Sequence, residues 1–150
     1  MIKTWPLGYK EARRRAKKIY SKIGRIQCPC LDNEYISFNR DGFDHLVYKG
    51  RISRTKNEQK KRFVLIEYAE QIIKQSTSYS YEEREMERKI LNKYRQRILV
   101  KSKARFWTFS LSIKGCEVKL VVIQIGEGFK RFCSIMGDKV KISRGKTKTP

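Results

Sequence analysis

A single histidine and the arginines that follow it are the residues of this 150-residue chain best suited to acid–base and phosphate chemistry. His45 is the only histidine, and an ordinary imidazole pKa of about 6.5 makes it the natural candidate for proton transfer near neutral pH. Arg51 and Arg54 follow across a turn at Gly50, and a guanidinium can hold two phosphate oxygens at once. The spacing therefore predicts a proton-transfer group beside phosphate-binding cations.

Positive charge is spread evenly along the whole chain. Lys and Arg number 36 against 15 Asp and Glu, which gives a formal net charge of +21. Residues 1–75 and 76–150 each contain 18 basic side chains, against 8 and 7 acidic ones. Such a surface is typical of a protein that meets phosphate, and nucleic acid is the partner that satisfies it over its full length. An anionic membrane is the lesser alternative, and an acyl-transfer enzyme would not need this charge.

The sequence lacks an obvious targeting segment. The N-terminus has no run of ~7–15 apolar residues of the kind found in a secretory signal. The most apolar stretches, at 63–66 and 120–125, fall far short of the ~20 residues that cross a bilayer. We therefore expect a soluble, cytoplasmic protein with no membrane partner.

The four cysteines do not have the spacing of a metal site. Cys28 and Cys30 are separated by one residue, whereas structural zinc sites favour ~2–4. Cys116 and Cys133 lie in strand-like segments, where a small buried hydrophobe is the plain interpretation. We therefore expect neither a metal nor another cofactor.

Hydrophobic periodicity predicts helices in the first half of the chain. Residues 9–23 repeat apolar side chains at helical spacing and place basic residues on the remaining face. A short helix over 41–48 would carry His45. Residues 55–58 have the spacing of a capping box, so a long helix with one core face should run over 55–74.

The second half of the chain changes to an alternating pattern that is typical of strands. Strands are predicted at 106–113, 118–125 and 130–136, with shorter ones at 35–38 and 78–81. The charged segment 82–97 fits either a helix or a long hairpin arm, and residues 139–150 predict a flexible basic tail. We therefore expect one α+β domain over 1–138, with N-terminal helices on one face of an antiparallel sheet of four or more strands and the other face left for a ligand.

Several short motifs between residues 26 and 138 are distinctive. They are FNRDGFDHLVYKGRISR at 38–54, EQKKRFVLIEYAEQII at 58–73, FWTF at 106–109, KLVVIQ at 119–124 and RFCSIMGD at 131–138. Together they resemble the phage and mobile-element branch of the barnase, EndoU, colicin tRNase and RelE-like nuclease superfamily. The resemblance implies N-terminal helices, a four-stranded antiparallel sheet and metal-independent cleavage of RNA on the exposed sheet face.

The implied reaction is attack of the RNA's own 2'-hydroxyl, which leaves a 2',3'-cyclic phosphate. It needs a base for that hydroxyl, a cation near the non-bridging oxygens and an acid for the departing 5'-oxygen. A pair of imidazoles is excluded because His45 is alone, so His45 is the expected proton-transfer group. Arg51 or Arg54 is the expected catalytic cation.

Further site residues come from the last strands. The resemblance implies a catalytic role for Ser134, which would bind phosphate or orient the 2'-hydroxyl. Its strand parity with Phe132 and Met136, however, would turn it toward the core if those two are buried. The residues expected to bind RNA are Lys49, Arg62, Gln124 and Arg131.

The same residues also fit plainer interpretations. His45 on a short apolar helix fits a core histidine that caps a backbone carbonyl, and the cations after it fit solvated charges at a helix end. Trp107 and Phe109 fit the core better than base stacking.

Two functions from different classes are therefore predicted. The first is an endoribonuclease, a toxin or mobile-element effector acting on tRNA, mRNA or rRNA, with an antitoxin or immunity protein as a further partner. The second is a non-catalytic RNA-binding or ribosome-associated basic protein. DNA binding is a weaker third interpretation, because the sequence contains no zinc finger, basic zipper or clear recognition helix.

Overall fold

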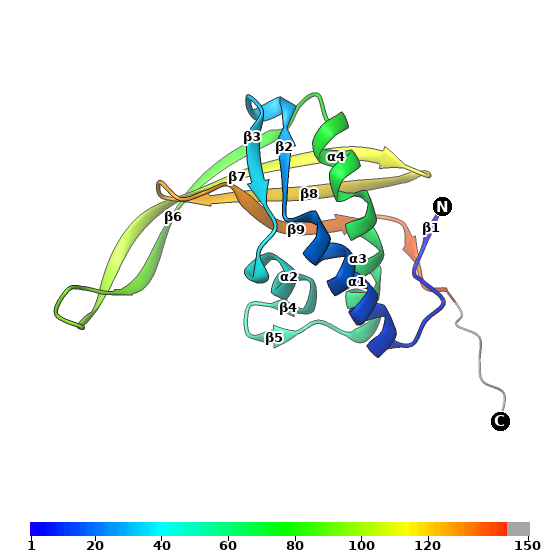
Figure 1. Cartoon of the computed structure of the whole chain (residues 1–150), viewed down its shortest axis with the longest axis horizontal. Helices are drawn as coiled ribbons and strands as arrows, with labels where there is room; N and C mark the ends of the chain where they lie inside the picture. The colour runs from blue at the N-terminus through cyan, green and yellow to red at the C-terminus, as the bar shows by residue number, and fades with distance from the viewer. Residues whose placement is uncertain (144–150) are drawn as a thin grey trace.

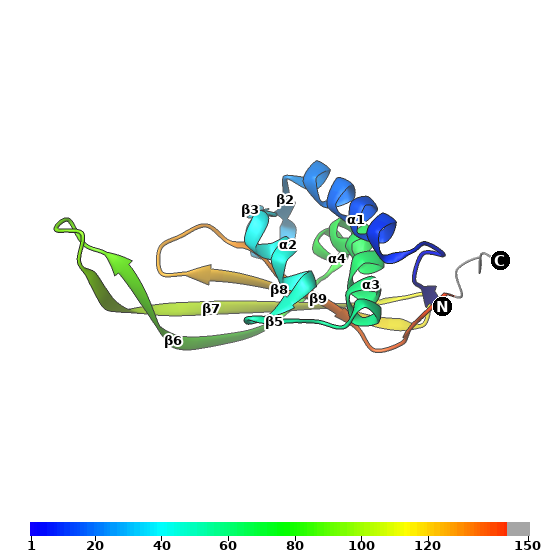
Figure 2. The same ribbon diagram turned by 90° about the horizontal axis from the view of Figure 1, so that it is seen from below.

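Four α-helices lie on one face of a six-stranded sheet in the computed structural model of the chain, which describes residues 1–143 (Figure 1, Figure 2). The helices are α1 (Tyr9–Ile23), α2 (Arg40–Val47), α3 (Lys56–Leu65) and α4 (Ala69–Gln75), with 3-10 turns η1 (Pro29–Leu31) and η2 (Ile66–Tyr68). The strands of the sheet are β2 (Arg25–Cys28), β3 (Glu34–Ser37), β6 (Ser80–Leu91), β7 (Arg97–Ile113), β8 (Cys116–Ile125) and β9 (Arg131–Gly137). The predicted α+β class is confirmed.

The sheet is mixed, which differs from the antiparallel sheet expected from the sequence. Its strand order is β2-β3-β9-β8-β7-β6. β3 runs parallel to β9 and meets it where Ser37 lies opposite Arg131, while the other neighbouring strands are antiparallel. The expectation was wrong because the β2–β3 hairpin, which follows α1, adds to the edge of β9. The resulting sheet has six strands rather than the four that the resemblance implied.

Two short strand pairs complete the described part of the chain. β1 (Ile2–Lys3) runs parallel to β10 (Val140–Lys141), and the Ser143 amide donates to the Thr4 hydroxyl at 2.8 Å. The predicted tail therefore does not begin at residue 139, although residues 144–150 lie outside the described residues. β4 (Tyr48–Lys49) and β5 (Ile52–Ser53) form a hairpin between α2 and α3.

The core lies between the helices and one face of β7, β8 and β9. Trp107 is 7% exposed and Phe109 is fully buried, so the prediction that these aromatics fill the core is confirmed. They lie opposite Val122 and Leu120 on β8, which are also buried. The alternation seen in the sequence therefore predicted which face of the sheet the helices cover.

The helix expected over 55–74 is interrupted by η2. The Thr55 hydroxyl accepts a hydrogen bond from the Glu58 amide at 3.2 Å, as a helix cap should. Residues 63–66 are each at most 3% exposed, so this segment is buried on every side. The tighter 3-10 turn separates α3 from α4. In α4, Ile72 and Ile73 are completely buried. No helix in the described part of the chain is both long and apolar enough to cross a membrane.

The segment that fitted either a helix or a hairpin is a hairpin arm. β6 pairs with β7 from Ser80 opposite Thr108 to Leu91 opposite Arg97, and the distal part projects beyond the helices (Figure 1). Three glutamates lie opposite basic residues across the strands: Glu83 and Arg105, Glu85 and Lys103, Glu87 and Lys101. Opposite charges at facing positions stabilise an antiparallel pair, which accounts for the strand conformation of so charged a segment.

Candidate active site

Helix α2 packs against β9 and carries His45. The Asn39 side chain caps the helix by accepting from the Gly42 amide at 3.2 Å. A β-carbon at Gly42 would lie only 2.8 Å from the carbonyl oxygen of Phe132, so glycine allows α2 to approach β9 closely. Phe43 and Leu46 are buried, which leaves His45 on the exposed side of the helix.

His45 opens into a small hollow between α2, the β4–β5 hairpin and the start of β9. The hollow has a volume of about 310 Å³ and is lined by Asp41, Asp44, His45, Tyr48, Gly50 and Arg131. Arg131 lies far from α2 in the sequence, yet its guanidinium is 3.7 Å from the Asp41 carboxylate. The structure therefore brings together two residues predicted for different roles, His45 for proton transfer and Arg131 for RNA binding.

The surroundings of His45 favour its neutral form. Partial burial of the ring lowers the pKa of His45 below its usual value, and the positive charges of Arg54 and Arg131 lower it further. The carboxylates of Asp41 and Asp44 act in the opposite direction without cancelling the effect. Since the shift is downward, the imidazole is mainly neutral at pH 7 and able to accept a proton.

Arg54 contacts the end of the helix that carries His45. Its Nε donates to the carbonyl oxygen of His45 at 3.1 Å, and its backbone amide donates to the carbonyl of Val47 at 2.8 Å. These bonds satisfy carbonyls at the C-terminus of α2, where a cation also suits the helix dipole. Within residues 1–143 the terminal guanidinium nitrogens of Arg54 have no hydrogen-bond partner, so they remain able to hold phosphate.

The β4–β5 hairpin carries the two other cations of the predicted group. Arg51 and Lys49 are exposed, and the turn between them uses Gly50 with a positive φ of 64°. Lys49 lines a separate hollow that also includes Arg54, whereas Arg51 lines neither hollow. Both therefore flank the His45 hollow without entering it.

Ser134 lies on the sheet face that the helices do not cover. A bulge between Val121 and Val122 interrupts the pairing of β8 with β9. As a result Phe132 is buried while Met136 is 40% exposed, and Ser134 shares the face of Met136. The parity that would have turned Ser134 into the core is broken by the bulge, and the serine does not line the His45 hollow.

Arg62 and Gln124 have partners inside the protein. Arg62 is 8% exposed, donates to the Ile135 carbonyl at 3.0 Å and pairs with Glu58 at 3.1 Å. It therefore connects α3 to β9 and is not available as a surface RNA contact. Gln124 donates to the Gly128 carbonyl at 2.9 Å, which fastens the loop between β8 and β9.

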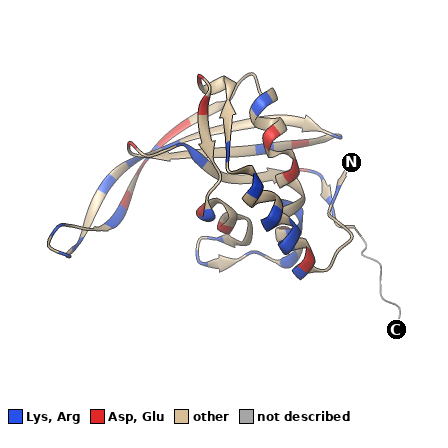
Figure 3. Cartoon of the chain, viewed as in Figure 1, with Lys and Arg blue, Asp and Glu red and all other residues tan. Residues whose placement is uncertain are grey.

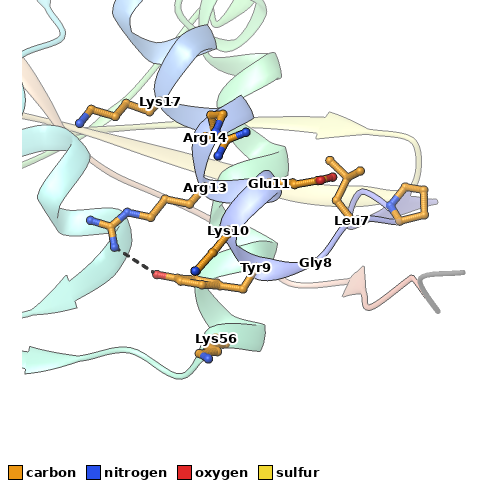
Figure 4. Close-up of a pocket in the computed structure, with 10 residues that line it drawn as sticks. Leu7, Gly8, Tyr9, Lys10, Glu11, Arg13, Arg14, Lys17 and Lys56 are labelled. Atoms are coloured by element: carbon orange, nitrogen blue, oxygen red, sulfur yellow. Dashed lines mark hydrogen bonds between the residues drawn. The ribbon is translucent and has the colours of Figure 1, made fainter. Parts of the chain in front are cut away.

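A larger cationic hollow lies at the start of α1 (Figure 4). Its volume is about 1080 Å³, and its charged lining residues are Lys10, Glu11, Arg13, Arg14, Lys17 and Lys56. The Arg13 guanidinium donates to the Tyr9 hydroxyl at 3.4 Å, and Lys56 lies 5.4 Å from the centre of the Tyr9 ring. Lys and Arg continue along α1 (Figure 3) and are exposed there, as the basic helix face predicted.

Three residues of the His45 hollow were missed from the sequence. Asp41 and Tyr48 stand at positions i−4 and i+3 relative to His45, which places them on the same side of the helix and its end, and Asp44 is the adjacent residue in the chain. That spacing was the signal that could have identified them. Arg131 carried no such local signal, because only sheet formation brings β9 to α2.

Comparisons with known proteins do not assign the chain to a family. No protein-family model matches it, and no curated protein or solved structure matches it. Within residues 1–143 no group of three or more His, Cys, Asp or Glu side chains is arranged to hold a metal ion, and the four cysteines are free thiols. Interpretation of the site therefore depends on its geometry and charge.

Proposed function

We propose that this protein is an endoribonuclease of the barnase, EndoU, colicin and RelE-like group. The observation that carries the proposal is the hollow in which His45, with its lowered pKa, lies beside Arg131. A neutral imidazole can accept the proton of a 2'-hydroxyl, and a guanidinium can hold the phosphate that this hydroxyl attacks. The net charge of +21 supplies the attraction that brings RNA to the surface.

Each step of the proposed cleavage has a residue in this hollow. His45 accepts the 2'-hydroxyl proton as the oxygen attacks phosphorus, and Arg131 stabilises the negative charge that develops on the non-bridging oxygens. The bond to the 5'-oxygen breaks, and the Tyr48 hydroxyl donates a proton to that leaving oxygen. The products are a 2',3'-cyclic phosphate and a free 5'-hydroxyl. Transfer of the proton from His45 to Tyr48 through solvent restores the site.

The remaining predicted residues lie outside the His45 hollow and would contribute by positioning α2 or by contacting RNA. Arg54 positions α2 through the His45 carbonyl, and from the neighbouring hollow that it lines its guanidinium would contact a phosphate beside the one that is cleaved. Arg51 and Lys49 are exposed beside the hollow, where they would contact phosphates on either side of the one that is cleaved. Ser134, on the uncovered sheet face, would contact RNA that passes across that face.

The decisive test is cleavage of total RNA by the purified protein in the presence of EDTA. We expect discrete new ends that carry 2',3'-cyclic phosphate, and we expect His45→Ala to lower the rate by a factor of about 10²–10⁴ while RNA affinity stays within twofold. The matched control is Arg40→Ala, an exposed change on the same helix that does not line the hollow. Equal cleavage by His45→Ala and the wild type would rule out the proton-transfer role.

The alternative is a non-catalytic RNA-binding or ribosome-associated protein. The observation that favours it is the cationic hollow at α1, which is larger than the His45 hollow and needs no proton-transfer group to bind phosphate. Binding of RNA without cleavage by both the wild type and His45→Ala would support this function. For the nuclease, the end-mapping experiment would also identify the substrate among tRNA, mRNA and rRNA, and an antitoxin or immunity protein would be a partner that covers the His45 hollow.

A further inference from the structure

Phe129 is the most exposed of the large hydrophobic side chains in the described part of the chain, at 87%. It lies in the loop between β8 and β9, and backbone hydrogen bonds hold that loop in place. The Gly128 amide donates to the Ile125 carbonyl at 3.0 Å, and the Ser37 amide donates to the Lys130 carbonyl at 3.0 Å. The structure therefore holds a phenyl ring in solvent on a fastened loop, where it adds nothing to the core.

Two adjoining hollows meet at this ring. The first is lined by Ser37, Asn39, Arg88, Ile125, Gly128, Phe129 and Arg131. The second has a volume of about 540 Å³ and shares Phe129, Gly128 and Ser37 with the first. Arg131 lines both the first hollow at Phe129 and the His45 hollow, and it therefore lies between them.

The side chains that line the two hollows at Phe129 include both cations and aromatic rings. Arg88 reaches the first hollow from the hairpin arm. In the second hollow the Arg25 guanidinium lies 4.0 Å from the centre of the Tyr35 ring. Glu34, the carboxylate that lines the second hollow, forms an ion pair with Lys130, so its negative charge is compensated. Aromatic faces beside guanidinium groups are the surface on which unpaired bases stack while their phosphates are neutralised.

We propose that Phe129 is the stacking platform of a subsite for an unpaired nucleotide next to the phosphate that is cleaved. The proposal rests on the nuclease function proposed above and makes it more specific, since the substrate must be single-stranded at the cleavage position. In a duplex the bases are already stacked on one another, and they do not offer a free face to a protruding ring. Arg131, between the two sites, holds the phosphate that joins them.

The test measures binding of a short single-stranded RNA that contains 2-aminopurine, with His45→Ala present in every protein so that cleavage does not interfere. Adding Phe129→Ala should weaken binding about tenfold, in line with the loss of one base–aromatic stack, and should abolish quenching of the 2-aminopurine fluorescence. Phe129→Tyr should restore both. The matched control is Tyr94→Ala, which removes an aromatic that is 70% exposed in the hairpin arm and should leave the quenching unchanged.

Three results would overturn the subsite. These are unchanged affinity in Phe129→Ala, absence of single-stranded RNA binding altogether, and an equal loss of affinity for a fully paired RNA. Unchanged RNA affinity would leave a protein partner as the occupant of the exposed ring.

The subsite and the nuclease function can fail separately. Stacking that depends on Phe129, in a wild-type protein that never cleaves RNA, would retain the subsite and remove the nuclease. Cleavage by the wild type that Phe129→Ala does not alter would retain the nuclease and remove the subsite.

Discussion

The hollow beside His45 and the hollow at the start of α1 use positive charge in different ways. The α1 hollow, at about 1080 Å³, gathers five Lys and Arg side chains against Glu11 alone. The His45 hollow, at about 310 Å³, sets Arg131 against Asp41 and Asp44. Exposed cations attract nucleic acid of any sequence. Proton transfer instead needs a group whose pKa is controlled by its surroundings. The larger and more cationic of these two hollows is therefore the better binding surface, and the smaller one is the better candidate for chemistry.

Arg131→Ala should distinguish the roles of the two hollows with the largest effect on cleavage. Loss of the guanidinium should lower the cleavage rate by a factor of about 10²–10³, as removal of one charge-stabilising donor does in other enzymes. Because Arg131 also lowers the pKa of His45, the acid limb of the kcat/KM profile should move to higher pH. The measurement is a pH–rate profile beside Arg40→Ala, and an unmoved acid limb would contradict the assignment.

Tyr48→Phe should lower the cleavage rate by a factor of about 10² and leave the α1 hollow unaffected. This factor is at the low end for the loss of a general acid, because solvent can replace the proton donor. The change removes only the hydroxyl, so RNA affinity should stay unchanged. A substrate with a p-nitrophenyl leaving group needs no proton on departure and should be cleaved at the wild-type rate. Equal slowing of both substrates would show that Tyr48 does not act as the acid.

Removing the positive charges of the α1 hollow should weaken RNA binding and leave the rate of cleavage unchanged. Replacing Lys10, Arg13, Arg14 and Lys17 with Gln should weaken RNA binding about tenfold at moderate salt. It should also reduce the slope of log affinity against log salt by roughly 0.7 for each phosphate of single-stranded RNA that the variant no longer neutralises. Cleavage at saturating RNA should be unaffected. A fall in the saturated rate with unchanged affinity would reverse the roles assigned to the two hollows.

Local patterns were sufficient for most of the helices and strands. The periodicity of residues 9–23 predicted α1, and the capping hydroxyl of Thr55 marked the start of α3, because helix formation and capping depend on residues within a few positions of each other. The break at η2 is not visible in the periodicity, because apolar residues keep helical spacing across it at positions 63, 66, 69 and 72. The pattern of 82–97 fits both a helix and a hairpin arm, because the charges of this segment find their partners on the opposite strand.

In the candidate site, too, some features follow from the local sequence and others only from the tertiary structure. The amino-acid sequence by itself determined the positive charge, the single titratable imidazole and the helix that carries it. Tertiary structure alone placed Arg131 at His45, turned Ser134 onto the uncovered face through a bulge, and buried Arg62 against the Ile135 carbonyl. Those outcomes depend on which strands become neighbours and on where a register shift occurs. The pairing of β3 with β9, between residues far apart in the chain, is a contact that no local pattern encodes.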